Sequence, residues 1–428
     1  MQYENVTGNV TGTKNSEYTQ NTLMKNTKQS IEKMYTELNS KAKGYIDKAV
    51  EKIVTAKTEQ KKVMVVTGSG PNIHEGVTTL IAELMSKGIV DSVTTSSAVI
   101  AHEMAGSLDK VKRVPWNAFN LQFEQDEIPR GELFEVTEMQ PSEIEELKNE
   151  MILDDEIFLT AEKQAGDTIV KAAGNMAYPM GLRTENISRE ILSIAQTYHI
   201  PFEQVAGWGA DKNTMLGAGA KAKLPVLVSV PQLIGGGAVG LSIGDSIPIS
   251  ERCMRIANMI DDAEVIIESA VALTQEIHDG PFECYTGHGI WAKWNGFNTC
   301  SLKGKTLVRI DVDSNLLKAK ELQDSSGSIQ KAIDKGLPKS KLTGIPFRME
   351  MSAFARHEGS LPIVGDIGVI WPIIAYKVAE GLEINLDFIS YPQQTDKGKE
   401  MREWIVSIVK PLNRQKILGK AQNYKILV

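Results

Sequence analysis

A glycine-rich turn, Thr67-Gly68-Ser69-Gly70-Pro71, follows the apolar run VMVV and precedes an amphipathic segment. A strand–turn–helix unit presents free backbone N–H groups at a helix N-terminus, where an anion is stabilised. The pattern is not GxGxxG, because the third glycine falls at Gly76, and it is not the GxxxxGK[ST] pattern of triphosphate sites. We expect a dinucleotide to bind at this turn, and the alternative is a plain tight turn.

Four hydroxyl residues, Thr94-Thr95-Ser96-Ser97, follow a second short apolar run. Ligands of open α/β sheets bind outside the carboxyl ends of the strands, so these side chains are candidates for contacts with ribose or phosphate oxygens. The alternative is a helix N-cap, which requires only one of the four.

Two His-Glu dipeptides, His74-Glu75 and His102-Glu103, lie close behind these two loops. Neither extends to HExxH, so zinc-protease chemistry is disfavoured and we expect no metal site. We predict that His102 is a general base oriented by the Glu103 carboxylate, and that His74 belongs to the cofactor site. The alternative is that both histidines are structural.

Three further motifs carry candidate ligands. The run Gly235-Gly236-Gly237 is expected to approach a ligand through its backbone, and Asp245 is expected to bind a substrate ammonium. Asp311 and Asp313 end the segment LVRIDVD and are candidates for ribose hydroxyls. A flexible turn and a helix cap are the alternatives.

Cys284 and His288, in ECYTGHG, stand four residues apart. A thiol beside an imidazole can form an activated nucleophile, so a cysteine-dependent hydrolase or transferase is an alternative function.

Short apolar runs alternate with helical patterns along most of the chain, which predicts a doubly wound, mostly parallel Rossmann-like sheet. The expected strands lie near 63–66, 90–93, 222–230, 262–270 and 305–313. Residues 1–28 are predicted to be a polar arm, 29–60 one helix, and 61–428 the catalytic domain with an insertion at 115–185. Ser142 and Glu145 form a capping-box pattern that predicts a helix over 143–153.

The composition excludes several classes of protein. A net charge of -7 with dispersed Lys and Arg disfavours nucleic acid as a partner. Three cysteines do not make a disulfide framework, and the polar N-terminus lacks a signal core, so we expect a cytoplasmic protein. Residues 224–244 are uncharged, but two prolines and five glycines favour a buried strand, a loop and a helix start over a membrane span.

The segment GSGPNIHEGVTTLIAELMSKGIVDSVTTSSAVIAHEM resembles the NAD-binding region of the archaeal-type ornithine cyclodeaminases and their LOR/SDH relatives. VRIDVDSNLLKAKELQDSSGS resembles the same family's strand ending in an acidic turn. The matching positions in the first segment are Gly68, Gly70, Pro71, His74, Gly76, Gly88, Val90, Asp91, Ala98, His102 and Glu103.

LPVLVSVPQLIGGGAVGLSIGD is also similar to a segment of deoxyhypusine synthase, at Pro225, Pro231, Gly240 and Asp245. The synthase forms an imine on a lysine in a Gly-Gly-Gly-x-Pro-Lys-His motif, and the nearest candidate here is Lys293. These resemblances imply NAD as cofactor, an amine or amino acid as substrate, an imine intermediate, and a homo-oligomer, a dimer or tetramer. A non-catalytic NAD-binding regulatory subunit is a further alternative.

Overall fold

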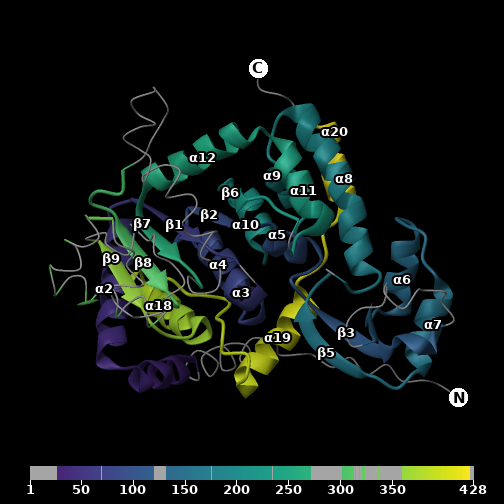
Figure 1. The fold of residues 1–428 in the computed structure, drawn as a ribbon, viewed down its shortest axis with the longest axis horizontal. Helices are drawn as coiled ribbons and strands as arrows, with labels where there is room; N and C mark the ends of the chain where they lie inside the picture. The colour runs from purple at the N-terminus through teal and green to yellow at the C-terminus, as the bar shows by residue number, and fades with distance from the viewer. Residues whose placement is uncertain are drawn as a thin grey trace, which may run out of the picture.

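The main sheet of the protein contains six parallel strands, shown in the computed structural model of Figure 1. The structure describes residues 27–424, apart from positions 69, 120–131, 175 and 234, residues 271–300 and most of 313–358. The strands are β1 (Lys62–Val66), β2 (Ser92–Ser96), β6 (Val226–Val230), β7 (Ala263–Glu268), β8 (Thr306–Ile310) and β9 (Ser360–Ile363). The five strands expected from the sequence are present, and β9 is an addition.

The strand order of this sheet is β6-β2-β1-β7-β8-β9. Counted along the chain as the first to the sixth strand, that order is 3-2-1-4-5-6, the order of the Rossmann fold. The chain builds outward from β1, then returns to the middle and builds outward from β7. β1 and β7 are hydrogen-bonded neighbours at this reversal. The structure therefore confirms the doubly wound, Rossmann-like sheet that the sequence predicts.

Both faces of the sheet are buried, because successive side chains of a strand point to opposite faces. In β1, Val63 and Val65 belong to the larger core cluster, whereas Met64 and Val66 belong to a second cluster. A parallel strand between two cores thus reads as a continuous apolar run.

Helices cover the two faces unequally (Figure 1). The larger cluster includes side chains of α2 (Ser40–Thr58), α4 (Val77–Ser86) and α18 (Ile367–Gly381). The second cluster includes side chains of α12 (Ile249–Asp262), which crosses from β6 to β7.

The predicted helix over 29–60 is wrong in one respect, because two helices occupy it. The first spans 27–37, and α2 begins at Ser40. Asn39 caps α2 by accepting a hydrogen bond from the Ala42 amide at 2.9 Å. Apolar residues keep helical spacing across this break, so periodicity alone did not reveal it.

The connection from β1 to β2 is also split. α3 (Gly70–His74) and α4 replace the single helix expected from His74 to Gly88. Gly76 separates them with φ +68°, and a Cβ there would lie 2.6 Å from the Met401 sulfur. Gly88, with φ +72°, follows α4 as expected.

A second, antiparallel sheet follows α5 (Ser97–Met104) at the lower right of Figure 1. Its order is β4-β3-β5, and it packs on α7 through Val114, Val136 and Ala161. The sequence predicted an insertion at 115–185 but none of its strands, because charged residues interrupt the apolar pattern. Its elements are β3 (Leu108–Pro115), β4 (Leu133–Thr137), β5 (Asp167–Ala172), α6 (Pro141–Lys148) and α7 (Asp155–Lys163).

The capping box of α6 lies two residues before the predicted one. Gln140 and Glu143 form it, instead of Ser142 and Glu145, and Pro141 takes the first helical position. Because proline favours that position, it starts the helix earlier than the serine suggested.

The uncharged stretch 224–244 forms β6, a short connection and the start of α11 (Gly237–Ser246), as predicted. None of the helices that the structure describes is long and apolar enough to span a membrane. The remaining elements are η1 (Trp116–Ala118), α8 (Met180–Tyr198), α9 (Phe202–Gly207), α10 (Met215–Ala222), α19 (Asp396–Ile408) and α20 (Arg414–Gln422).

Candidate functional site

The carboxyl ends of β1, β2 and β7 lie side by side on one edge of the main sheet. Val66 pairs with Thr94 of β2 and with Glu268 of β7, and all three strands are parallel. The residues that follow β1 and β2 therefore reach a common edge, as the sequence predicted. In a sheet of this order the ligand crevice lies where the chain reverses, which here is between β1 and β7.

A chain of buried hydrogen bonds fixes the two loops at the reversal. The Trp371 indole N–H donates to Ser269 Oγ at 2.7 Å, and Ser269 Oγ donates to Asn72 Oδ1 at 2.5 Å. The Asn72 amide in turn donates to the Gly68 carbonyl. α18 thus positions both the loop after β7 and the glycine turn after β1.

Three threonine hydroxyls at this edge have no hydrogen-bond partner among the described residues. They belong to Thr67, Thr94 and Thr95, and all three residues are fully buried. A buried polar atom without a partner is uncommon and calls for a physical reason such as a bound group. Hydroxyls can both donate and accept, which suits contacts to ribose and phosphate oxygens.

No separate loop connects β2 to α5, because the strand runs directly into the helix. Ser96 is the N-cap of α5 and accepts from the Val99 amide at 3.3 Å. Ser97 Oγ accepts from the Gln232 amide at 3.1 Å. Two of the four predicted hydroxyl ligands therefore have structural partners, which leaves Thr94 and Thr95.

The glycine run packs against the start of α5. A Cβ on Gly236 would lie 2.6 Å from Ser97 Cβ, and one on Gly235 would lie 2.9 Å from Ala98 Cβ. Gly237, with φ +53°, faces Glu185 instead. Close packing alone thus requires glycine at 235 and 236, and a ligand role for this run remains a prediction.

His102 is buried in α5, and its ring has a fixed orientation. Its Nδ1 lies 2.7 Å from the Ala173 carbonyl oxygen. A carbonyl only accepts, so Nδ1 carries the proton and Nε2 is left as the acceptor. Burial lowers the pKa of His102, and the hydrogen bond to Ala173 opposes that effect. The ring is therefore neutral near pH 7.

The prediction that Glu103 orients His102 is wrong, because the Glu103 carboxylate accepts hydrogen bonds from another helix. Its two oxygens accept from the Met215 amide at 2.8 Å and the Leu216 amide at 3.0 Å, at the start of α10. Adjacent residues of a helix do not face each other, so Glu103 points away from the imidazole. Burial raises the pKa of Glu103 to about 7, although both amide hydrogen bonds favour the ionised form.

His74 and Glu75 also separate. Glu75 is buried and accepts from the backbone and side-chain amides of Gln393 at 2.7 and 2.8 Å, and burial raises its pKa. The His74 ring instead lies 3.5 Å from the Arg402 guanidinium of α19. Burial, Arg402, His102 and Lys171 together lower the pKa of His74 to about 4.

Asp245 lies near the carboxyl end of β6, because a Cβ on the preceding residue, Gly244, would lie 3.6 Å from Pro231 Cβ. It is exposed in the last turn of α11, eight residues after Gly237. Its role as a ligand for a substrate ammonium remains a prediction. Its backbone carbonyl accepts from Gln196.

The other predicted ligands divide into two groups. Asp311 follows β8 with φ +61°, near the same edge. Ser69, Asp313, Cys284, His288 and Lys293 lie outside the described residues, so their assignments remain predictions.

A buried ion pair at the same edge was not recognised in the sequence. Glu268 ends β7, and its Oε2 lies 2.5 Å from Arg309 of β8. The other oxygen, Oε1, has no partner among the residues described. The sequence signal was an acidic residue at the end of a strand. The segment Glu268-Ser269-Ala270 contains no glycine, unlike the motifs that were predicted to bind ligands.

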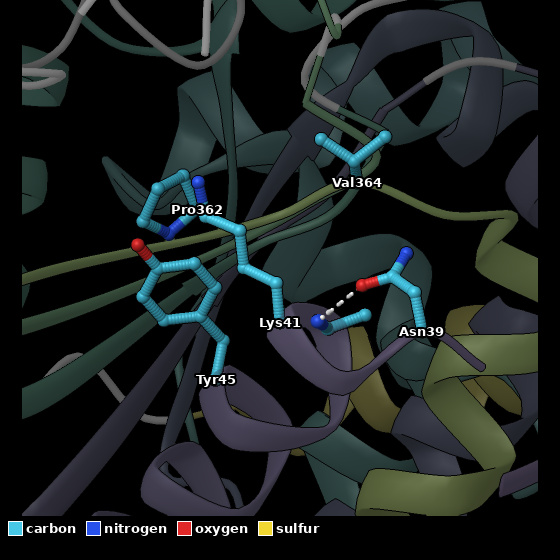
Figure 2. Close-up of a pocket in the computed structure, with 6 residues that line it drawn as sticks. Asn39, Lys41, Tyr45, Pro362 and Val364 are labelled. Atoms are coloured by element: carbon cyan, nitrogen blue, oxygen red, sulfur yellow. Dashed lines mark hydrogen bonds between the residues drawn. The ribbon is translucent and has the colours of Figure 1, made fainter. Parts of the chain in front are cut away.

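A small cavity lies beside the outermost strand of the sheet, between α2 and β9 (Figure 2). Asn39, Lys41 and Tyr45 line it from the helix, and Pro362 and Val364 from the strand side. Its volume of about 60 Å³ admits a few water molecules but no amino acid or nucleotide. We therefore place the candidate site at the carboxyl ends of β1, β2 and β7.

No protein-family model matches the chain, and no curated protein matches it. Similar solved structures include a ternary complex of AgrE with ornithine and NAD+, at 11% identity and TM-score 0.39, covering 80% of this chain and 34% of that one. ArgZ, an arginine dihydrolase from the ornithine-ammonia cycle in Cyanobacteria, is 12% identical with TM-score 0.36, covering 78% and 31%. A LOR/SDH-type protein from Methanococcus maripaludis S2 is 10% identical with TM-score 0.36, covering 81% and 70%.

The chain spans about a third of the length of AgrE and ArgZ. At these identities and TM-scores the likeness carries no argument about activity, and the fold assignment rests on the strand order. The similarity to deoxyhypusine synthase remains a prediction from the sequence.

Proposed function

We propose that this protein binds NAD at the carboxyl ends of β1, β2 and β7 and transforms a small amine or amino acid. The observation that carries the proposal is the strand order 3-2-1-4-5-6, with the glycine turn directly after β1 at the point of reversal. A dinucleotide crosses the sheet at this point in folds of this order.

The residues present fit such a cofactor. The unpartnered hydroxyls of Thr67, Thr94 and Thr95 supply donors and acceptors, and the turn at Gly68 and Gly70 brings bare backbone to the crevice. Glu268 Oε1 is a free acceptor at the neighbouring strand end. When bound, NAD would supply a hydride acceptor for the carbon that bears the substrate amine.

His102 is the proposed general base. Its protonated Nδ1 is fixed on the Ala173 carbonyl, so Nε2 is positioned to accept a proton from the substrate nitrogen or from an attacking water or amine. The low pKa keeps this nitrogen unprotonated at neutral pH. The backbone carbonyl thus takes the orienting role that the sequence assigned to Glu103.

The nucleophile that attacks the proposed imine decides the reaction class. Cyclisation, deamination and amine transfer all follow from attack of a second nucleophile on an imine, and Lys293 is the proposed covalent residue for the last. Cytoplasmic location and assembly as a homo-oligomer remain predictions.

Calorimetry with NAD tests the cofactor site. Thr67→Val removes an unpartnered hydroxyl at the carboxyl edge, and Ser360→Ala removes one at the amino end of β9, on the opposite edge. We expect Thr67→Val to weaken NAD binding by about fivefold, the value of one hydrogen bond, and Ser360→Ala to leave it unchanged. Equal effects of the two variants would contradict the placement.

Native mass spectrometry of the purified protein separates the alternatives. Bound NAD(H) supports the proposal. A nucleotide-free protein that iodoacetamide inactivates supports a cysteine enzyme built on Cys284 and His288. NAD binding without turnover of any amine supports a regulatory subunit.

A turnover assay with His102→Gln tests the base. The panel includes L-ornithine, because AgrE binds ornithine and NAD+ in a similar structure. We expect a loss of about a hundredfold in kcat with unchanged NAD affinity. Unaffected turnover would exclude this role for His102.

A further inference from the structure

Two cationic side chains and a half-buried imidazole lie beside the glycine turn. His74 ends α3, Arg402 lies on α19, and Lys171 lies on β5 of the antiparallel sheet. Arg402 Nη2 is 3.5 Å from His74 Nδ1 and also donates to the Val170 carbonyl, next to Lys171. A Cβ on Gly70 would lie 4.0 Å from His74 Cδ2, so the imidazole adjoins the turn.

Arg402 is half-buried, and it differs from the three arginines that are buried in the described part of the chain. Arg183, Arg252 and Arg309 each have a glutamate oxygen within 2.7 Å. Arg402 has no carboxylate within 4 Å among the described residues, and its Nε is buried without a partner. A charge taken out of water without a counter-ion is strongly unfavourable.

Glu75 does not neutralise Arg402. It raises the pKa of Arg402 through space, but both Glu75 oxygens accept hydrogen bonds from Gln393. A Cβ on Gly368 would meet Glu75 Oε2 at 2.3 Å, so the carboxylate is held tightly where it is.

The positive potential near Arg402 affects the pKa of His74. After burial, the positive charge of Arg402 does most to lower the pKa of His74 to about 4. Glu135 forms an ion pair with Lys171, yet Lys171 still acts on His74. An anion placed among these groups would pair with the guanidinium and accept hydrogen bonds from it.

We infer that Arg402, His74 and Lys171 bind a carboxylate group of the substrate, beside the glycine turn. The guanidinium presents a planar fork of N–H donors that matches a carboxylate. A dinucleotide phosphate would lie at the start of α3, whereas His74 is four residues further along, about 6 Å. That the carboxylate belongs to the substrate rests on the proposed function, whereas the anion site itself does not. A substrate whose carboxylate binds here is an amino acid and not a simple amine.

Acetate is the probe for the site. The full chain is titrated with sodium acetate in place of sodium chloride at constant ionic strength and pH 7, and the His74 ring signal is followed by NMR. That signal is assigned as the one missing from His74→Gln. We expect a saturable shift, and a linear, non-saturating response would overturn the inference.

Variants of α19 give the matched comparison. Arg402→Gln is expected to raise the dissociation constant for acetate at least tenfold. Lys399→Gln removes an exposed cation from the same helix and is expected to change it less than twofold. Arg402→Lys keeps the charge without the fork, so we expect an intermediate value, which also decides the matter if Arg402→Gln fails to fold. Equal affinity in all four proteins would contradict the site.

NAD affinity separates the carboxylate from a phosphate. We expect Arg402→Gln to bind NAD within twofold of the unaltered protein, and a tenfold loss would assign the anion to the dinucleotide instead. If the unaltered protein does not bind NAD, the proposed function fails, and the acetate titration still decides the anion site.

Discussion

The same dipeptide, His-Glu, follows β1 and β2, and the two copies have different surroundings. His102 is buried and hydrogen-bonded to a neutral carbonyl, whereas His74 is half-buried beside an arginine. In both copies the glutamate turns away, Glu103 to the start of α10 and Glu75 to Gln393. Adjacent helical residues face different neighbours, so the tertiary contacts decide what each imidazole can do. The first copy suits anion binding and the second suits proton transfer.

The largest expected effect separates the two glutamates. Thr214 and Glu103 together accept from the first three amides of α10, so Glu103→Ala leaves two buried donors unsatisfied. We expect the free energy of unfolding to fall by about 3 kcal/mol. Glu75→Ala frees Gln393, which lies near the surface, and should cost about 1 kcal/mol. Urea unfolding of both variants measures the difference, and equal losses would erase the contrast.

The two copies also predict opposite dependence of stability on pH. The pKa of Glu103 rises from 4.5 to about 7 on folding, so its contribution is fully present below pH 4.5 and is lost as the pH rises through 7. The pKa of His74 falls from 6.5 to about 4, so its contribution is present above pH 6.5 and is lost as the pH falls through 4.

Glu103→Gln and His74→Gln isolate these contributions. Between pH 5 and pH 8, Glu103→Gln should gain about 3 kcal/mol in unfolding free energy relative to the unaltered protein. The unfolding free energy of His74→Gln should rise relative to that of the unaltered protein as the pH is lowered. Urea unfolding at several pH values measures both slopes, and slopes of the same sign would refute the assignment.

A smaller effect is expected at His74 itself when its cationic neighbour is removed. Arg402→Gln takes away the charge that, after burial, does most to lower the pKa of His74. We expect that pKa to rise from about 4 toward 6.5, while the pKa of His102 stays low because burial is its main cause. NMR titration of the ring signals distinguishes the two histidines. An unchanged His74 would mean that burial alone accounts for it.

The sequence predicts those features of the two regions that depend on local residue patterns. Apolar runs before Thr67 and Thr94 identify neighbouring parallel strands, and glycine and hydroxyl residues mark their carboxyl ends. The 3-2-1-4-5-6 order follows from helix crossovers of one hand, but β9 escaped notice because SLPI is only four residues long and contains a proline.

The side-chain partners could not be predicted in the same way. Arg402 stands 328 residues from His74, and nothing in the local sequence of α19 distinguishes it from the exposed cations around it. Ala173 orients His102 through a backbone carbonyl, which leaves no trace in residue type. The error at His102-Glu103 was avoidable, since helix geometry keeps adjacent side chains apart.

The smallest expected effect concerns how the second copy is positioned. α5, which carries His102, starts at a single side-chain cap, Ser96. Ser96→Ala should lower the free energy of unfolding by about 1 kcal/mol and move the His102 ring signal, because the cap fixes the first turn of that helix. Ser407→Ala is the control, since that hydroxyl bonds only a carbonyl on the exposed side of α19. An equal shift of the His74 and His102 signals in Ser96→Ala would mean that the two His-Glu copies are not positioned independently. They would then belong to one shared site.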